Sequence, residues 1–243
     1  VSASDEEEEE IPDTPVHLFV SKQGYLKKIT PQSLRMSGEQ KFKEGDSLSF
    51  SAESNNREGL LVFTDRFQCY KSRLSDFEDS KASLLGDYLP QKLGMDPGEN
   101  VLHVLLPGDY KGFVLFFFEN GKAAKVPLSA YETKTNRRKL TGAYSDKAVL
   151  KGIYCMTEDT QLALYATDGR CLIFSAAQLQ VKTTRNTIGV AVMTLKKNKL
   201  VERAQLLEDT SIQNPTRYRS KTLPTAGAIL KEEDSEEKQQ ALF

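Results

Sequence analysis

Basic side chains recur in this sequence at a fixed distance from a series of predicted turns. Lys28, Lys71 and Lys125 each stand four residues after a turn position. Ammonium groups in a segment with few apolar neighbours bind phosphate oxygens, and such contacts carry no sequence information. The spacing therefore predicts a surface that meets a polyanion rather than one that carries out a reaction.

Two further basic pairs keep a common spacing. The strings "KTNR" and "KTTR" place Lys134 and Arg137, and then Lys182 and Arg185, at the same two offsets after their turns. Equivalent positions of a repeated fold share a face, so we expect a basic belt along one rim. The alternative is ordinary solvated surface charge, and the matched offsets favour the belt. The full set of candidate phosphate contacts is Lys27, Lys28, Arg35, Lys41, Lys71, Lys81, Lys125, Lys134, Arg137, Arg138, Lys139, Lys182 and Arg185.

The elements that must position these side chains are repeated strand–turn–strand units. Four stretches align without gaps on the turn positions Gly24, Phe67, Gly121 and Gly169, which are 43, 54 and 48 residues apart. Each unit has later strand-like runs, so we assign about four short strands to each repeat. This period and patterning are typical of a propeller-like array. The absence of Trp counts against a WD40 propeller. Helical periodicity is weak, with one possible turn of helix in 84–93.

Residues suited to catalysis are sparse. His17 and His103 fall inside strand-like runs, far apart in the sequence, and a buried histidine explains each more simply than a catalytic base. The sequence contains no H-E-x-x-H, G-x-x-x-x-G-K-S/T or G-x-G-x-x-G motif. Paired acids such as Asp76 and Glu78 lie in a predicted loop. We expect no catalysis by this chain alone, and no metal or cofactor.

Charge divides the 243 residues into three parts. Residues 1–14 carry a net charge of −7 and residues 231–243 carry −3, which leaves +9 for residues 15–230 of a chain whose total is −1. A basic body between acidic ends favours a polyanionic partner. Cys69, Cys155 and Cys171 have no metal-site spacing, and we expect small buried thiols in a reducing cytosol. No apolar run is long enough for a membrane span. Because the chain begins with Val, we expect a fragment of a longer protein.

The repeat, the strand–turn–Lys pattern and the basic loop together resemble the C-terminal domain of the A subunit of bacterial type IIA topoisomerases, namely DNA gyrase and topoisomerase IV. Three segments carry the resemblance. "GYLKK" (24–28) resembles the family's blade signature, "TRNTIGVAVMTL" (184–195) its Arg-x-x-x-Gly-Val strand, and "YRSKTLPTAGAIL" (218–230) a closing segment. The resemblance covers roughly residues 15–230 and implies a β-pinwheel, a propeller variant whose neighbouring blades exchange strands.

One motif of the gyrase branch is missing. Gyrase carries a Gln-Arg-Arg-Gly-Gly-(Lys/Arg)-Gly box in its first-blade loop, whereas the matching loop here reads "RMSGEQKFKEGD" (35–46). This difference puts complete DNA wrapping in doubt and favours the topoisomerase IV type. The resemblance also implies that the DNA-cleaving tyrosine lies in an N-terminal region which this chain lacks, so no tyrosine here receives that role.

The expected organisation is an all-β pinwheel of about four to five four-stranded blades. We predict an acidic linker (1–14), a DNA-binding β-pinwheel domain (15–230) and an acidic tail (231–243). Within the domain, we place repeats near 15–56, 57–109, 110–157 and 158–209, followed by a closing segment (210–230).

The function implied is sequence-independent binding and bending of duplex DNA, which positions it for ATP-dependent strand passage. The expected partners are double-stranded DNA, the ATPase B subunit of the parent enzyme, and the rest of its A subunit, with no membrane, in the bacterial cytoplasm at the nucleoid. Two alternatives stay open. One is a gyrase A domain with a diverged box, and the other is a propeller that serves as a protein-interaction platform.

Overall fold

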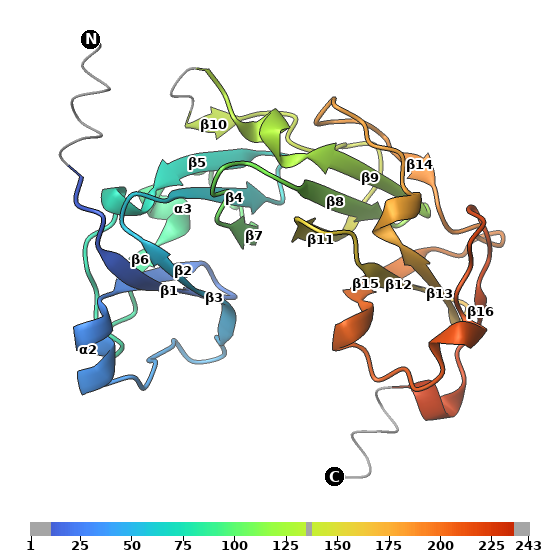
Figure 1. Ribbon diagram of the computed structural model, residues 1–243, viewed down its shortest axis with the longest axis horizontal. Helices are drawn as coiled ribbons and strands as arrows, with labels where there is room; N and C mark the ends of the chain where they lie inside the picture. The colour runs from blue at the N-terminus through green and yellow to red at the C-terminus, as the bar shows by residue number, and fades with distance from the viewer. Residues whose placement is uncertain (1–10, 135–137, 236–243) are drawn as a thin grey trace. The chain divides into compact units, whose positions relative to one another are not determined.

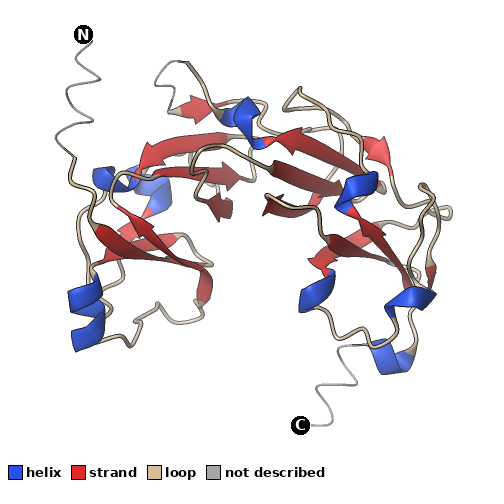
Figure 2. Cartoon of the chain, viewed as in Figure 1, coloured by secondary structure: helices blue, strands red, loops and turns tan. Residues whose placement is uncertain are grey.

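The computed structural model describes residues 11–134 and 138–235 of an all-β chain (Figures 1 and 2). The chain divides into two compact units. The first comprises Val1–Asp109 and Thr133–Ala143, and the second comprises Tyr110–Glu132 and Tyr144–Phe243. Each unit contains two four-stranded antiparallel sheets. This division is finer than the single domain predicted for residues 15–230.

The first unit holds the first and second sheets. The strands of the first sheet, in spatial order, are β3 (Leu48–Asn55), β1 (Pro15–Ser21), β2 (Tyr25–Ile29) and β6 (Asp87–Tyr88). The strands of the second sheet are β10 (Lys139–Leu140), β5 (Cys69–Arg73), β4 (Gly59–Thr64) and β7 (Val101–Leu105).

The second unit holds the third and fourth sheets. The strands of the third sheet are β11 (Leu150–Met156), β8 (Phe113–Phe118), β9 (Lys122–Pro127) and β14 (Val190–Ala191). The strands of the fourth sheet are β15 (Val201–Leu206), β12 (Gln161–Ala166), β13 (Arg170–Ser175) and β16 (Ala228–Ile229).

Every sheet takes its fourth strand from a later part of the chain. β6 pairs with β2 only after the chain has passed through β4 and β5 of the second sheet. β10 and β14 join the second and third sheets in the same way, whereas β16 joins the fourth sheet directly after β15 of that sheet. We call these four the exchange strands. Each predicted repeat therefore supplies three strands of its own sheet, rather than four. Strand exchange confirms the predicted β-pinwheel.

Helices are short and lie between strands. α2 (Pro31–Met36) has Thr30 as its N-cap, whose side chain accepts a hydrogen bond from the Ser33 amide, and proline occupies its first turn. α3 (Leu89–Lys92) lies within the stretch 84–93 where a turn of helix was predicted. The 3-10 turns are η1 (Leu74–Asp76), η2 (Leu128–Tyr131), η3 (Ala176–Gln178), η4 (Leu207–Asp209), η5 (Pro215–Arg217) and η6 (Glu232–Asp234).

The apolar cores form where the sheets of one unit pack together. Leu18 and Leu26 of the first sheet pack against Leu60 and Val62 of the second. In the second unit, a larger cluster joins side chains of the third and fourth sheets. β4, β8 and β12 are buried on both faces, which explains their continuous apolar sequences. One face of β1 is buried and the other is partly exposed, so burial alternates along the strand.

Glycine marks the entry to three of the exchange strands. Gly189 has φ +79, and a Cβ there would collide with the carbonyl oxygen of Ala123 on the neighbouring strand. Gly227 has φ +72 and stands equally close to the carbonyl of Cys171. Only glycine tolerates both the left-handed backbone and this approach. "TIGVA" and "TAGAI" are therefore the local signals of exchange strands, and the second sheet has Lys139 at the equivalent position.

Residues 207–235, which extend the predicted closing segment (210–230) at both ends and take that name from here on, cover the face of the fourth sheet that is turned away from the third sheet. Tyr218 packs there with Tyr165, Cys171 and Ile173. The hydroxyl of Tyr218 donates a hydrogen bond to Asp234, which is only 2% exposed and also accepts from the backbone amide of Gln213 at 2.8 Å. Asp234 falls within the predicted acidic tail (231–243), so the first part of that stretch is a structural element.

Candidate nucleic-acid interface

Two of the lysines four residues after a turn are buried rather than exposed. Lys28 Nζ donates to the carbonyl of Leu74 at 3.0 Å and to Asn56 Oδ1 at 2.7 Å, and it lies 3.6 Å from Asp79. Each of the acceptors lies beyond the first sheet's own strands, and Leu74 opens η1 directly after the hairpin of the second sheet. Lys28 therefore connects the first sheet to the second.

Lys125 repeats this arrangement in the second unit. Its Nζ donates to the carbonyl of Ala176 at 3.0 Å and to Asp159 Oδ1 at 2.7 Å. Ala176 opens η3 directly after the hairpin of the fourth sheet, so the lysine again ties one sheet to the next. In the second sheet, Lys71 Nζ donates to Thr133 Oγ1 at 3.0 Å. The repeated lysine is thus a connector between consecutive elements of the fold.

Lys27 is the third buried lysine of the candidate set. Its Nζ donates to the Lys41 carbonyl at 2.8 Å, to the Ala82 carbonyl at 2.9 Å and to Gln40 Oε1 at 3.1 Å. Burial, followed by repulsion from Lys41, lowers the pKa of Lys27. These hydrogen bonds hold the loop 38–47 against the first sheet.

Burial changes the assignment of three predicted phosphate contacts. Lys27, Lys28 and Lys125 are 3%, 4% and 4% exposed, and their ammonium groups point to internal oxygen atoms. A phosphate cannot reach an amine without displacing these partners, so we assign the three lysines a structural role. Sequence spacing detected the repeat correctly, but the repeated residue stabilises the fold.

Replacing Lys125 with methionine is expected to lower the free energy of unfolding by about 2–4 kcal/mol, because the carbonyl of Ala176 loses its buried donor and Asp159 its ion pair. The lower part of this range allows for the partial exposure of Asp159. Urea unfolding gives the measurement. DNA affinity per folded molecule should stay unchanged, and a large affinity loss without loss of stability would contradict the structural role.

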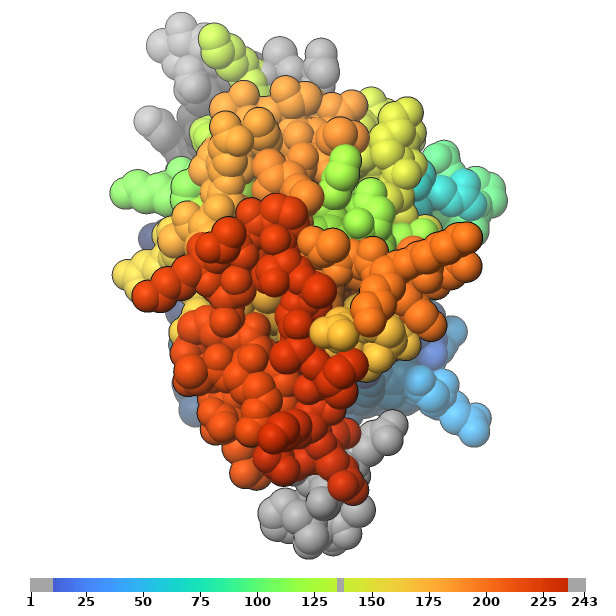
Figure 3. Space-filling model, turned by 90° about the vertical axis from the view of Figure 1, so that its right-hand side faces the viewer, coloured from blue at the N-terminus to red at the C-terminus, as the bar shows by residue number. Residues whose placement is uncertain are grey.

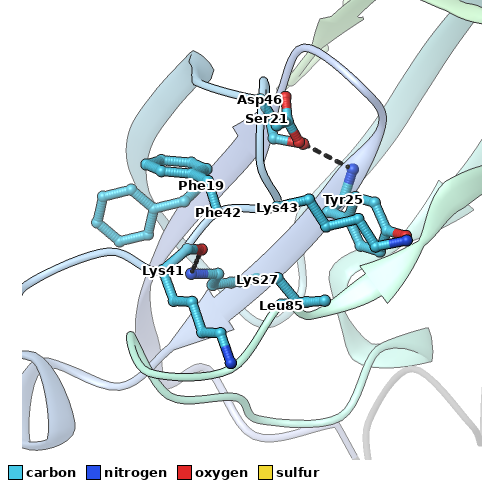
Figure 4. A pocket seen from close by; sticks show the side chains of 9 residues that line it. All are labelled: Phe19, Ser21, Tyr25, Lys27, Lys41, Phe42, Lys43, Asp46 and Leu85. Atoms are coloured by element: carbon cyan, nitrogen blue, oxygen red, sulfur yellow. Dashed lines mark hydrogen bonds between the residues drawn. The ribbon is translucent and has the colours of Figure 1, made fainter.

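The loop that corresponds to the gyrase box contacts the first sheet through a few side chains (Figure 4). The Lys43 ammonium lies 5.2 Å from the centre of the Tyr25 ring, and Lys27 lies 5.5 Å from that of Phe42. The cavity lined by these residues, with Phe19 and Asp46, holds only about 10 Å³. A volume this small leaves no room for a phosphate inside the cavity, although Lys41 and Lys43 are exposed on the outer side of the loop.

The remaining candidates keep access to solvent to different degrees. Lys139 is paired with Asp96 at 3.8 Å, and its side chain is 40% exposed. Lys182 and Arg185 are half-buried. Arg185 Nη1 donates to the Ala130 carbonyl at 2.9 Å, which orients the guanidinium. Lys71 is half-buried, and Arg137 lies outside the described residues. The exposed candidates are Arg35, Lys41, Lys81, Lys134, Arg138 and Lys139.

The candidates nearest to the exchange strands share a location in the fold. We call the stretches that lead into these strands the exchange segments: residues 78–88, 132–140, 180–191 and 217–229, of which 135–137 are not described. Lys134, Arg138 and Lys139 lie on the second of these segments, and Lys182 and Arg185 on the third. The fourth segment carries Arg219 and Lys221, both exposed, and neither was among the predicted contacts. The similarity of "TAGAI" to "TIGVA" is the signal that aligns this segment with the third.

The histidines and cysteines form no reactive group in the described residues. His17 Nε2 lies 2.9 Å from Ser51 Oγ and stacks on Phe19. Burial lowers the pKa of His103 to about 4, so this ring is neutral at pH 7. Cys69 and Cys171 are buried as predicted, but Cys155 is exposed because it lies on the edge strand β11.

Metal sites and membrane spans are both lacking within residues 11–134 and 138–235. No three His, Cys, Asp or Glu side chains gather there as metal ligands. None of the helices described is long and apolar enough to cross a membrane.

Comparison with known proteins places the chain beside topoisomerase subunits. No protein-family model matches it. In the A subunit of DNA topoisomerase 4 from Staphylococcus epidermidis, 205 residues align at 25% identity, which covers 82% of this chain and 26% of that protein. The Bacillus subtilis subunit is 26% identical over 68% of the chain and 20% of the protein. A probable chloroplastic or mitochondrial DNA gyrase A protein of Oryza sativa is 22% identical over 86% and 23%. The chain thus spans only 20–26% of the length of these relatives.

Solved structures agree with this placement. The C-terminal domain of a DNA topoisomerase IV superposes with a TM-score of 0.78 at 22% identity, covering 92% of this chain and 76% of that one. The Escherichia coli ParC C-terminal domain gives 0.67 at 14% identity, over 90% and 95%. A DNA gyrase A C-terminal domain gives 0.54 at 14% identity, over 91% and 80%. The predicted family resemblance is confirmed: the homologues of this chain are A subunits of topoisomerase IV and DNA gyrase, and it has the fold of their C-terminal domains.

Proposed function

We propose that this chain binds duplex DNA without sequence preference, as the non-catalytic C-terminal domain of a topoisomerase IV-like A subunit. The observation that carries the proposal is the recurrence of solvent-accessible basic residues on the exchange segments of both units. Lys134, Arg138 and Lys182 lie there, on segments of the second and third sheets. Such residues contact phosphates, which position a duplex but do not report its sequence.

The parent enzyme in this proposal is a strand-passing topoisomerase. Its partners are the ATPase B subunit of that enzyme and the rest of the A subunit, and it acts at the bacterial nucleoid. The domain bends DNA and presents it for ATP-dependent strand passage. The loop 38–47 supports a topoisomerase IV-like role over a gyrase-like one, because its sequence offers no Gly-rich basic box.

A salt titration with duplexes of unrelated sequence tests DNA binding. With about six to eight phosphate contacts, the slope of log K against log salt should lie near −5 to −7, and it should be the same for all duplexes. Fluorescence transfer between dyes at the two duplex ends reports bending in the same samples. A slope near zero would reject the DNA-binding function and favour the protein-interaction platform.

A further inference from the structure

The exchange segments can be compared position by position, because the backbone anchors each of them in a similar way. Isolated parallel bridges join Lys28 to Asp79 in the first sheet, Lys125 to Val181 in the third, and Ile173 to Arg219 in the fourth. The amides of Ser80, Lys182 and Ser220 then donate to the carbonyls of Lys28, Lys125 and Ile173. Asp79, Val181 and Arg219 are therefore structural equivalents.

The first exchange segment is acidic at these positions. Glu78 and Asp79 are exposed, and Asp87 follows in the same segment. Lys81 is its single basic residue. The Asp79 side chain is 62% exposed although it lies 3.6 Å from Lys28 Nζ, so its charge remains at the surface. A phosphate at this place would meet carboxylates and be repelled.

The fourth exchange segment has the opposite charge. Residues 217–229 contain three basic residues and no acid. Arg217 Nη1 forms ion pairs with Glu233 Oε1 at 3.5 Å and with Asp234 Oδ2 at 4.0 Å, both in the closing segment. Arg219 and Lys221 are exposed. Arg219 Nε donates to Gln161 Oε1 at 2.8 Å, which orients the side chain on the fourth sheet.

The fourth exchange segment meets the stretch that directly follows the third one, and both stretches lie in the second unit. The Thr225 amide donates to the Val192 carbonyl at 3.1 Å, and the Thr194 amide donates to the Thr225 carbonyl at 3.0 Å. Figure 3 shows this side of the second unit, where the red closing segment borders the orange stretch that follows the third segment. The basic residues of the two segments therefore belong to one folded unit.

We propose that Arg219 and Lys221 extend the DNA-binding surface onto the closing segment, and that the exchange segment of the first sheet takes no part in DNA binding. The proposal rests on the proposed function and names which parts of the chain carry it out. The sign of the charge at equivalent positions supports it, since Asp79 in the first sheet corresponds to Arg219 in the fourth. The domain thus has exchange segments that bind DNA and one that lies outside the DNA-binding surface.

The test compares neutral variants of the full chain in fluorescence anisotropy titrations with a labelled duplex. Lys221→Gln should weaken binding about eightfold at 0.1 M salt, since one contact contributes about 0.9 logarithmic unit per decade of salt. Arg219→Gln with Lys221→Gln should weaken it about 60-fold and make the salt slope shallower by about 1.8. Both side chains are exposed, so the urea midpoint should hardly change.

The matched variants lie on the first exchange segment. Lys81→Gln removes the exposed charge of a residue that this proposal excludes from the predicted phosphate contacts, and Glu78→Lys replaces a negative charge with a positive one. Each should leave the affinity within about twofold if DNA stays away from this segment. Tighter binding of Glu78→Lys by severalfold, or weaker binding of Lys81→Gln equal to that of Lys221→Gln, would overturn the proposal. If the unmodified chain binds DNA and the Arg219/Lys221 double variant binds equally well, this inference is wrong but the proposed function still holds. If the unmodified chain does not bind DNA, the proposed function fails with it.

Discussion

Replacing Lys134, Arg138 and Lys182 together with alanine is expected to weaken duplex binding about 500-fold at 0.1 M salt, with an equal loss for every sequence. Each phosphate contact contributes about 0.9 logarithmic unit per decade of salt, so three lost contacts multiply to this factor. The salt slope should become shallower by about 2.7. Anisotropy titrations at several salt concentrations measure both quantities on the same protein.

A control variant with the same change in net charge tests whether DNA binds to the exchange segments or is attracted by the overall charge of the chain. Lys22, Arg66 and Lys147 are exposed and lie outside the exchange segments. Their triple alanine variant should lose only a few-fold in affinity, because charges more than about 10 Å from the DNA are screened at 0.1 M salt. Equal losses in the two triple variants would show that overall charge, rather than the exchange segments, binds DNA.

Replacing Glu99 with alanine is expected to lower the free energy of unfolding by about 4 kcal/mol, one of the largest losses available to a single residue. Glu99 is 3% exposed and accepts hydrogen bonds from Thr64 at 2.5 Å, Tyr70 at 2.8 Å and Gln68 at 2.9 Å. Truncation leaves these buried donors without an acceptor. Burial, then the hydrogen bond to Glu99, raises the pKa of Tyr70, so its hydroxyl remains a donor at all ordinary pH values.

Urea unfolding checks this loss against two further variants. Glu99→Gln keeps one acceptor oxygen and should lose about half as much stability as the alanine variant. Glu58 accepts a hydrogen bond from Ser54 at 2.9 Å near the surface, and Glu58→Ala should lose about 1 kcal/mol or less. An unfolding midpoint for Glu99→Ala equal to that of the unmodified chain would show that the buried acceptor is not needed.

Local sequence predicted the hairpins well, because a hairpin is decided by residues close together in the chain. The turn positions Gly24, Gly121 and Gly169 have positive φ angles in the structure, and Phe67 takes the same left-handed conformation at φ 60. The apolar runs on either side become the central strands. Turn chemistry and apolar patterning act over a few residues, and the repeat made each of them visible four times.

The exchange strands could not be derived in this way. β6 and β14 have two residues each, so neither shows a period of two, and their partners lie in an earlier part of the chain. The one local signal was a glycine before the strand, and Gly189 needs no side chain because the Ala123 carbonyl occupies that space. That reason appears only when the two segments are packed together. For the same reason, the sequence did not identify Arg219 and Lys221 of the closing segment as candidate phosphate contacts.

The sequence by itself determined the repeat, the all-β class and the excess of positive charge between residues 15 and 230. Only the tertiary structure decided which charges meet solvent. Lys125 and Lys182 are the same residue type in the sequence. In the structure, Lys125 points to the Ala176 carbonyl inside the fold, while Lys182 is half-buried on an exchange segment. A lysine side chain is long enough to be buried or exposed from the same backbone position, so the choice depends on whether an oxygen from a distant part of the chain lies within reach of its amine.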